Sequence, residues 1–130
     1  MSEENVESVR AGYIALARGD MKTVLDLIDE NIVIEGHVAP DVGPAQGRNG
    51  LLANLANVRE AFDELHYEPL EMIALEERVL VHICVSAKGR EGIEVQHEFG
   101  QVWTFRDGKA VRLQTYPDWE QALEAAGVKE

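Results

Sequence analysis

The stretch that decides the fold is residues 94–116, EVQHEFGQVWTFRDGKAVRLQTY. Two runs of β-branched and aromatic residues flank the dipeptide Asp107-Gly108. This dipeptide is favoured where both central positions of a hairpin turn need positive φ. Hydrophobic and polar residues alternate on both sides of the turn, and a period of two indicates a strand with one buried face. The stretch therefore predicts a β-hairpin.

The buried face of this hairpin carries two polar side chains, His97 and Gln101, among large hydrophobic ones. The residues that share their parity before the turn are Ile93, Val95, Phe99, Trp103 and Phe105. After the turn, Val111 and Leu113 are expected to point to the same face. Polar groups in such positions are either satisfied inside a core or line a pocket, and the pattern leaves both open.

Length and composition predict one domain over residues 1–130, large enough to form its own hydrophobic core. The net charge of −12 argues against nucleic acid or an anionic membrane as a partner, since both require a basic patch. The apolar runs are strand-length, which argues against a membrane span. The acidic N-terminus has no apolar signal region, which predicts a cytoplasmic protein.

Helical periodicity begins at the N-terminus. Apolar residues at steps of three and four predict a first helix that ends at Gly19. Asp20 is the expected N-cap of a second helix that runs to Ile28. A Gly- and Pro-rich loop is expected over residues 36–50, and a third helix over residues 51–62.

The remaining elements are mostly strands. Strands are expected at residues 31–35, 67–75 and 79–87, followed by the long hairpin, and Asp118 is the expected N-cap of a terminal helix at 119–126. The predicted order is ααβαββββ with a short C-terminal helix. Helices that precede an antiparallel sheet and cover one of its faces give an α+β fold.

These elements resemble the SnoaL-like group of the nuclear transport factor 2-like, or ketosteroid isomerase-like, superfamily. The resemblance covers nearly the whole chain and rests on Gly19-Asp20, Gly47-Arg48, WTFRDGK and the final YPD. It implies a cone: a curved antiparallel sheet packed on three N-terminal helices, with a pocket inside and an outer sheet face often used for dimerisation. Members include isomerases, polyketide cyclases, epoxide hydrolases and dehydratases, so the fold alone does not determine the function.

The resemblance argues against steroid isomerase chemistry. The position of the isomerase oxyanion tyrosine falls at Gly12, next to Tyr13, and that of the base falls at Gly36, next to Glu35. The position of the second acid falls at Gln101, which can donate a hydrogen bond but cannot exchange a proton. A shift of one residue that brings in Tyr13 or Glu35 is left open.

His97 is the candidate general base, because it has inward parity and histidine titrates near neutral pH. The alternative is a histidine that is hydrogen-bonded within the core. The other candidates for the pocket are Tyr13, His37, Asp41, Gln101 and Trp103. Each of them has a structural alternative, as a core side chain or as a solvated residue of the mouth loop.

Neither a metal nor a cofactor is predicted. Cys84 stands alone and cannot form an intramolecular disulfide or a thiolate zinc site. His82 has the parity of the outer sheet face and is expected to lie apart from His97. The outer face is expected to carry Leu80, His82, Cys84, Ser86, Val102 and Thr104, and such a mixed surface predicts a homodimer.

The sequence thus predicts a protein that binds a small hydrophobic molecule in an apolar pocket, and it leaves open whether the protein is an enzyme. If it is, the expected chemistry is cofactor-free proton transfer, as in an isomerase or cyclase, with His97 as the base. The alternative is a non-catalytic ligand-binding or dimerisation module of the same fold. A trafficking role is a third hypothesis, for which no partner groove is visible.

Overall fold

The computed structural model describes residues 2–36, 45–53, 64–89 and 92–128. Its elements are α1 (Ser2–Ala17), α2 (Met21–Asp26), β1 (Ile28–Gly36), β2 (Ala45–Gln46), β3 (Glu64–Leu75), β4 (Arg78–Lys88), β5 (Glu94–Arg106), β6 (Lys109–Tyr116) and α4 (Trp119–Ala126). Residues 47–53 are also helical. The strands of this described part form one sheet in the order β2-β1-β6-β5-β4-β3. The predicted α+β fold is confirmed.

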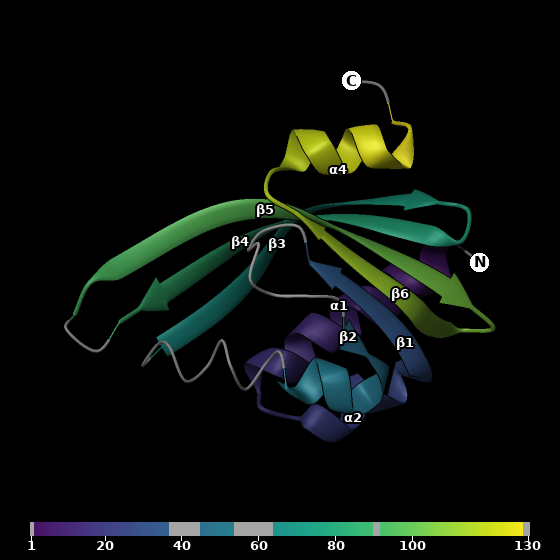
Figure 1. Ribbon diagram of the computed structural model, residues 1–130, viewed down its shortest axis with the longest axis horizontal. Coiled ribbons are helices and arrows are strands. Elements are labelled where there is room, and N and C mark those ends of the chain that lie inside the picture. Colours follow the sequence, from purple (N-terminus) through teal and green to yellow (C-terminus); the bar gives the residue numbers. More distant parts are fainter. Residues whose placement is uncertain (1, 37–44, 54–63, 90–91, 129–130) are drawn as a thin grey trace.

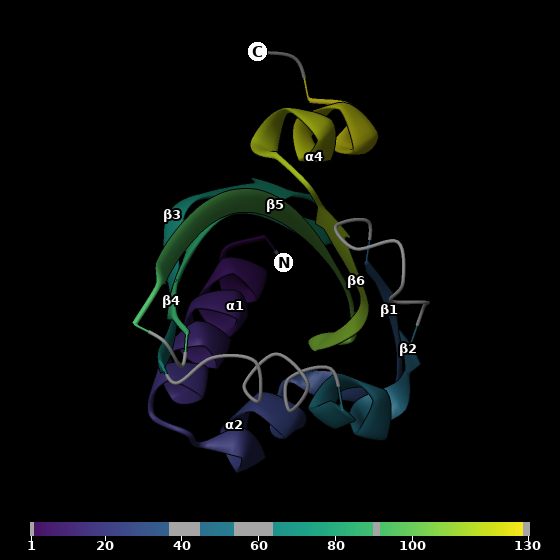
Figure 2. The same cartoon turned by 60° about the vertical axis from the view of Figure 1, so that its left-hand side comes forward.

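The sheet is strongly curved and arches over α1, which lies in its concave side (Figure 2). The helix α2 and the helical residues 47–53 lie beneath the arch, and α4 lies on the opposite, convex side (Figure 1). The sheet is antiparallel except where β1 pairs with β6 in parallel. The curved sheet and α1 form the sides of the cone (Figure 2).

The decisive hairpin forms as predicted, with one irregularity. Asp107 and Gly108 both have positive φ, 52° and 80°. Phe105 pairs with Ala110, but the register shifts at the next pair, which is a β-bulge. The extra residue is Val111, so Ala110 takes the core position that simple alternation assigned to Val111. The expectation for Val111 was wrong because a bulge inverts parity.

The second helix begins at its predicted N-cap, Asp20, but it ends at Asp26 rather than Ile28. Ile28 instead begins β1, where it pairs with Ala110. The backbone N–H of Ala110 donates to the carbonyl of Leu27 at 3.0 Å. A hydrogen bond from the hairpin therefore replaces the next helical turn, and local periodicity contains no signal for it.

The expected loop over residues 36–50 is shorter than predicted. Its last part forms β2, which pairs with Val33 and Ile34 of β1, and helix follows directly at residues 47–53. Asn49 lies inside this helical stretch, which begins before the predicted start of the third helix at residue 51. His37, Asp41 and the rest of the predicted third helix lie outside the described residues.

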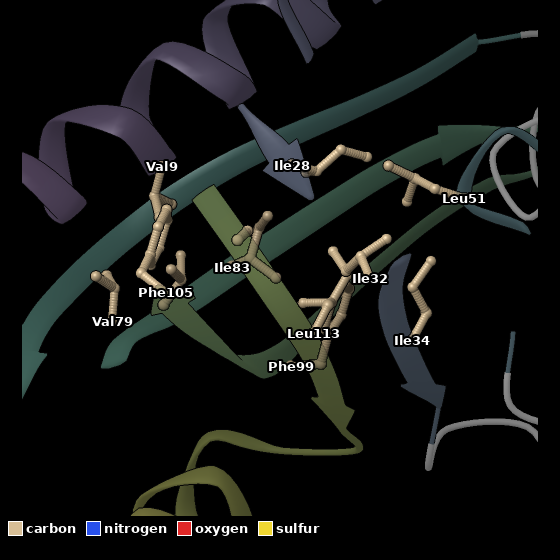
Figure 3. Packing of buried hydrophobic residues seen from close by; sticks show 12 residues of the cluster. Val9, Ile28, Ile32, Ile34, Leu51, Val79, Ile83, Phe99, Phe105 and Leu113 are labelled. Atoms are coloured by element: carbon tan, nitrogen blue, oxygen red, sulfur yellow. The ribbon is translucent and has the colours of Figure 1, made fainter. Parts of the chain in front are cut away.

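The main core fills the concave side of the sheet. Figure 3 shows Val9 of α1 beside Phe105 and Val79, and the other labelled side chains extend this core along the sheet. The buried members are Val9, Ile28, Ile32, Ile34, Leu51, Val79, Val81, Ile83, Phe99, Phe105, Ala110 and Leu113. No helix among the described residues is long and apolar enough to cross a membrane.

A second, smaller core lies on the convex side, under α4. Leu80 and Val102 are 0% and 2% exposed there, because they pack against one face of α4. His82 is on this outer face, as predicted, and its ring stacks on Trp119 at 5.0 Å between centroids. The expectation that this part of the face is free for a second subunit was wrong, since the chain's own α4 covers it. Ser86, farther along β4, is only half-buried.

Candidate functional site

A cavity of about 110 Å³ lies inside the cone, between α1, α2 and the concave face of the sheet. Most of its wall is apolar, and the polar exceptions are Ser8, Tyr13, Tyr67, Gln101 and Trp103. Among the described residues, none of the side chains that line the cavity carries a charge. The cavity is therefore suited to an uncharged guest, because a buried charge without a partner is costly.

A chain of hydrogen bonds crosses one wall of the cavity. The hydroxyl of Tyr13, on α1, donates to Oε1 of Gln101 on β5. Nε2 of Gln101 in turn donates to Oγ1 of Thr115 on β6 at 3.4 Å. Gln101 and Thr115 are opposite each other in the β5–β6 register. These hydrogen bonds therefore connect α1 to both strands of the hairpin, β5 and β6.

Tyr13 keeps its proton in this setting. Burial raises the pKa of the Tyr13 hydroxyl well above its ordinary value; the nearby indole N–H of Trp103 opposes this rise, and Tyr67 adds to it. The ring of Trp103 meets that of Tyr13 edge-on, at 6.4 Å and 88°. Trp103 Nε1 is buried and forms no hydrogen bond with the residues that the structure describes. The wall thus has a neutral phenol, and the indole nitrogen beside it is buried.

The structure brings three of the sequence candidates together: Tyr13, Gln101 and Trp103 all line the cavity. His37 and Asp41 lie outside the described residues, so their place in the pocket stays a prediction.

His97 lies apart from this group. It shares the inner face of β5 with Gln101 and stacks on Phe99 at 6.0 Å, but its side chain is exposed and does not line the cavity. It lies four positions before Gln101, which corresponds to about 13 Å along a strand.

Sequence reasoning missed Thr115 and Tyr67. The signal for Thr115 was its parity with Leu113, which faces the core, but pairing it with Gln101 required the register of the hairpin. The bulge near the turn hides that register from simple counting. Tyr67 comes from β3, an edge strand that reaches the cavity only because the sheet curves around α1.

The site contains no set of metal ligands among the described residues, where no three His, Cys, Asp or Glu side chains are grouped to hold an ion. Cys84, on the other face of the sheet, is buried, and its Sγ accepts a hydrogen bond from Gln96 at 3.3 Å. The chemistry available at the cavity wall is therefore that of neutral hydroxyl, amide and indole groups.

A curved sheet that encloses a helix and an apolar cavity defines the class of NTF2-like cone proteins. The model of the SnoaL-like domain matches residues 9–113 of this chain, so the chain belongs to the SnoaL-like domain family. No curated protein matches the sequence significantly.

Solved structures share the fold over nearly the full length. An NTF2-like protein from Burkholderia xenovorans is 29% identical, with 97% of each chain covered and a TM-score of 0.77. TerC, co-crystallised with polyporic acid, is 24% identical, with 93% of this chain and 96% of that chain covered and a TM-score of 0.80. A Mycobacterium tuberculosis protein in complex with estradiol-17β-hemisuccinate is 13% identical, with 90% and 95% covered and a TM-score of 0.76.

Proposed function

We propose that this protein binds a small, uncharged and largely apolar molecule inside the cone. The observation that carries the proposal is the cavity of about 110 Å³, whose described wall is apolar apart from a few neutral polar groups. An engineered apolar cavity of about 150 Å³ in another protein binds benzene, so a single-ring compound has the appropriate size. Burial of apolar surface supplies the affinity, at roughly 25 cal/mol per Å².

Two solved relatives support the proposal by analogy. TerC was crystallised with polyporic acid, and the M. tuberculosis protein was crystallised with an estradiol derivative. Both are proteins of similar fold that were crystallised with ring compounds. The cavity of the present chain is small, and therefore we propose a smaller ligand for it.

The test uses methylcyclohexane as the probe and amide chemical shifts of the full chain as the readout. Addition of the probe should shift the amides of residues that line the cavity, such as Val9, Leu16 and Leu113. Gly12→Leu should abolish these shifts by filling the cavity; a Cβ at Gly12 meets only Leu27, at an ordinary 3.6 Å. Ala11→Leu, on the exposed side of the same helix, is the matched control and should bind normally.

Binding that survives in Gly12→Leu would place the probe elsewhere and overturn the proposal. Absence of any shift in the native chain would overturn it as well. The folding of both variants is checked by their unfolding transitions before binding is compared.

Proton transfer with His97 as the base is the second candidate. It is favoured by one observation, the position of His97 on the inner face of β5, stacked on Phe99 of the core. A reacting group would have to extend from the cavity towards the exposed end of β5 to reach the imidazole. For any reaction found, His97→Ala should lower the rate and remove the fall in rate at acidic pH, because a general base works only when it is unprotonated. An unchanged pH–rate profile would rule His97 out.

A further inference from the structure

We propose that the cavity recognises a hydroxyl group on its ligand, and that Thr115 sets this preference by holding the amide of Gln101. The inference rests on the proposed function, which it narrows to alcohols and phenols. Thr115 does not line the cavity, so it acts as a positioning residue through Gln101.

The inference depends on the direction of the hydrogen bonds among Tyr13, Gln101 and Thr115. A phenol has one proton to donate, and Tyr13 gives its proton to Oε1 of Gln101. Gln101 presents this oxygen because its other end, Nε2, is engaged by Thr115. The Tyr13 hydroxyl therefore offers only acceptor lone pairs to a ligand, and the ligand must donate. Tyr13 is protonated at neutral pH, since its ordinary pKa of about 10 is raised further by burial.

A ligand hydroxyl meets the requirement at this wall, because it can donate a hydrogen bond to an oxygen that only accepts. A ketone oxygen can only accept, so it leaves the lone pairs of Tyr13 unsatisfied.

Hydrogen bonds that ran in the opposite direction would predict the opposite ligand preference. If Thr115 donated to Oε1 and Nε2 donated to Tyr13, the phenol proton would be free, and a carbonyl ligand would be preferred. A comparison of two ligands that differ only in this respect therefore distinguishes the two directions.

The experiment compares cyclohexanol, cyclohexanone and methylcyclohexane, titrated into the full chain and followed by amide chemical shifts. Cyclohexanol should bind about threefold to tenfold more tightly than cyclohexanone, the range that one hydrogen bond provides. Equal or tighter binding of cyclohexanone would overturn this inference while leaving the proposed function intact. Failure of all three compounds to bind would overturn both.

Three variants locate the cause. Thr115→Val keeps the shape but releases Gln101, and it should reduce the ratio of the two affinities to less than about twofold. Thr104→Val changes a threonine of the same sheet that takes no part in these hydrogen bonds. It should leave the ratio of the two affinities unchanged. Tyr13→Phe should abolish the preference while methylcyclohexane still binds. If Thr115→Val keeps the same ratio of cyclohexanol to cyclohexanone affinity as the native protein, Thr115 does not set the preference.

Discussion

Gly100 of β5 and Ala122 of α4 lie so close together that a Cβ on Gly100 would be 2.5 Å from the Cβ of Ala122. The absence of a side chain at Gly100 is therefore what allows α4 to settle on the convex face of the sheet. On this face α4 covers Leu80 and Val102, and its last carbonyl, that of Ala126, accepts from Arg78 at 3.1 Å. The terminal helix is thus an integral part of the fold.

The first prediction concerns this contact. Gly100→Ala should lower the free energy of unfolding by about 1–3 kcal/mol, because the added methyl group overpacks the interface. Urea denaturation measures the change. Ala122→Gly in the same chain restores the space, so the double variant should lose less than the sum of the two single variants. Strict additivity would show that the two positions do not compete for this space.

The second prediction concerns the start of α4 and its dependence on pH. The backbone N–H of Gln121 donates to the Asp118 carboxylate at 2.8 Å, and this bond, with a second from the Gln121 side chain, lowers the pKa of Asp118. The pKa of Asp118 is lower in the folded protein than in the unfolded chain. The stability that this carboxylate contributes is therefore present above the unfolded pKa of about 4 and is lost as the pH falls through the folded pKa. The protection factors of the α4 amides, which correct for the slower intrinsic exchange in acid, should therefore fall as the pH drops below about 4.

Two substitutions separate the cap from the charge. Asp118→Asn should keep α4 protected at pH 7 and weaken the acid sensitivity, since Asn caps as well as Asp but does not titrate. Asp118→Ala should reduce the protection of the α4 amides both at pH 7 and in acid. An acid sensitivity in Asp118→Asn equal to that of the native chain would assign the effect to another carboxyl group.

The third prediction concerns Tyr13 at high pH. Its pKa is raised by burial, so the stability that this group contributes is present below the unfolded pKa of about 10 and is lost as the pH rises further. Above about pH 10, the native chain should lose stability more steeply than Tyr13→Phe. Denaturant midpoints at a series of pH values measure the difference, and parallel curves for the two proteins would contradict it.

The fourth prediction concerns self-association. A homodimer through the outer face stays a prediction, and Ser86 and Gln96 of that face line a surface hollow of about 470 Å³. Ser86→Arg should weaken such a dimer at least about tenfold, because the new charge would be desolvated in the contact. Sedimentation velocity measures the effect. Ala11→Arg adds the same charge on the exposed side of α1 and serves as the control; equal behaviour of the two variants would place any contact elsewhere.

Much of the candidate site was accessible from parity alone. Gln101 and Trp103 were assigned to the inner face by alternation with their neighbours, and both line the cavity. The same argument assigned His97 inward, and its parity is indeed that of Gln101, but parity says nothing about where along a strand the cavity ends. His97 lies beyond that end, where the side chain is exposed.

The sequence by itself determined the features that depend on a few neighbouring residues. These are the turn at Asp107-Gly108, the caps at Asp20 and Asp118, and the helix end at Gly127, whose positive φ of 79° suits a residue without a Cβ. Each arises from local sterics and hydrogen bonds within a few residues, which is why composition and spacing are enough to predict it.

Only the tertiary structure decided what faces what across long separations. The bond between Tyr13 and Gln101 joins residues 88 positions apart, and it exists because the curved sheet brings β5 against α1. The bulge moved Ala110 into the core, and the packing of Ala122 on Gly100 turned an expected subunit surface into an internal one. These outcomes depend on register and on close packing between distant segments, and neither is encoded in a local pattern.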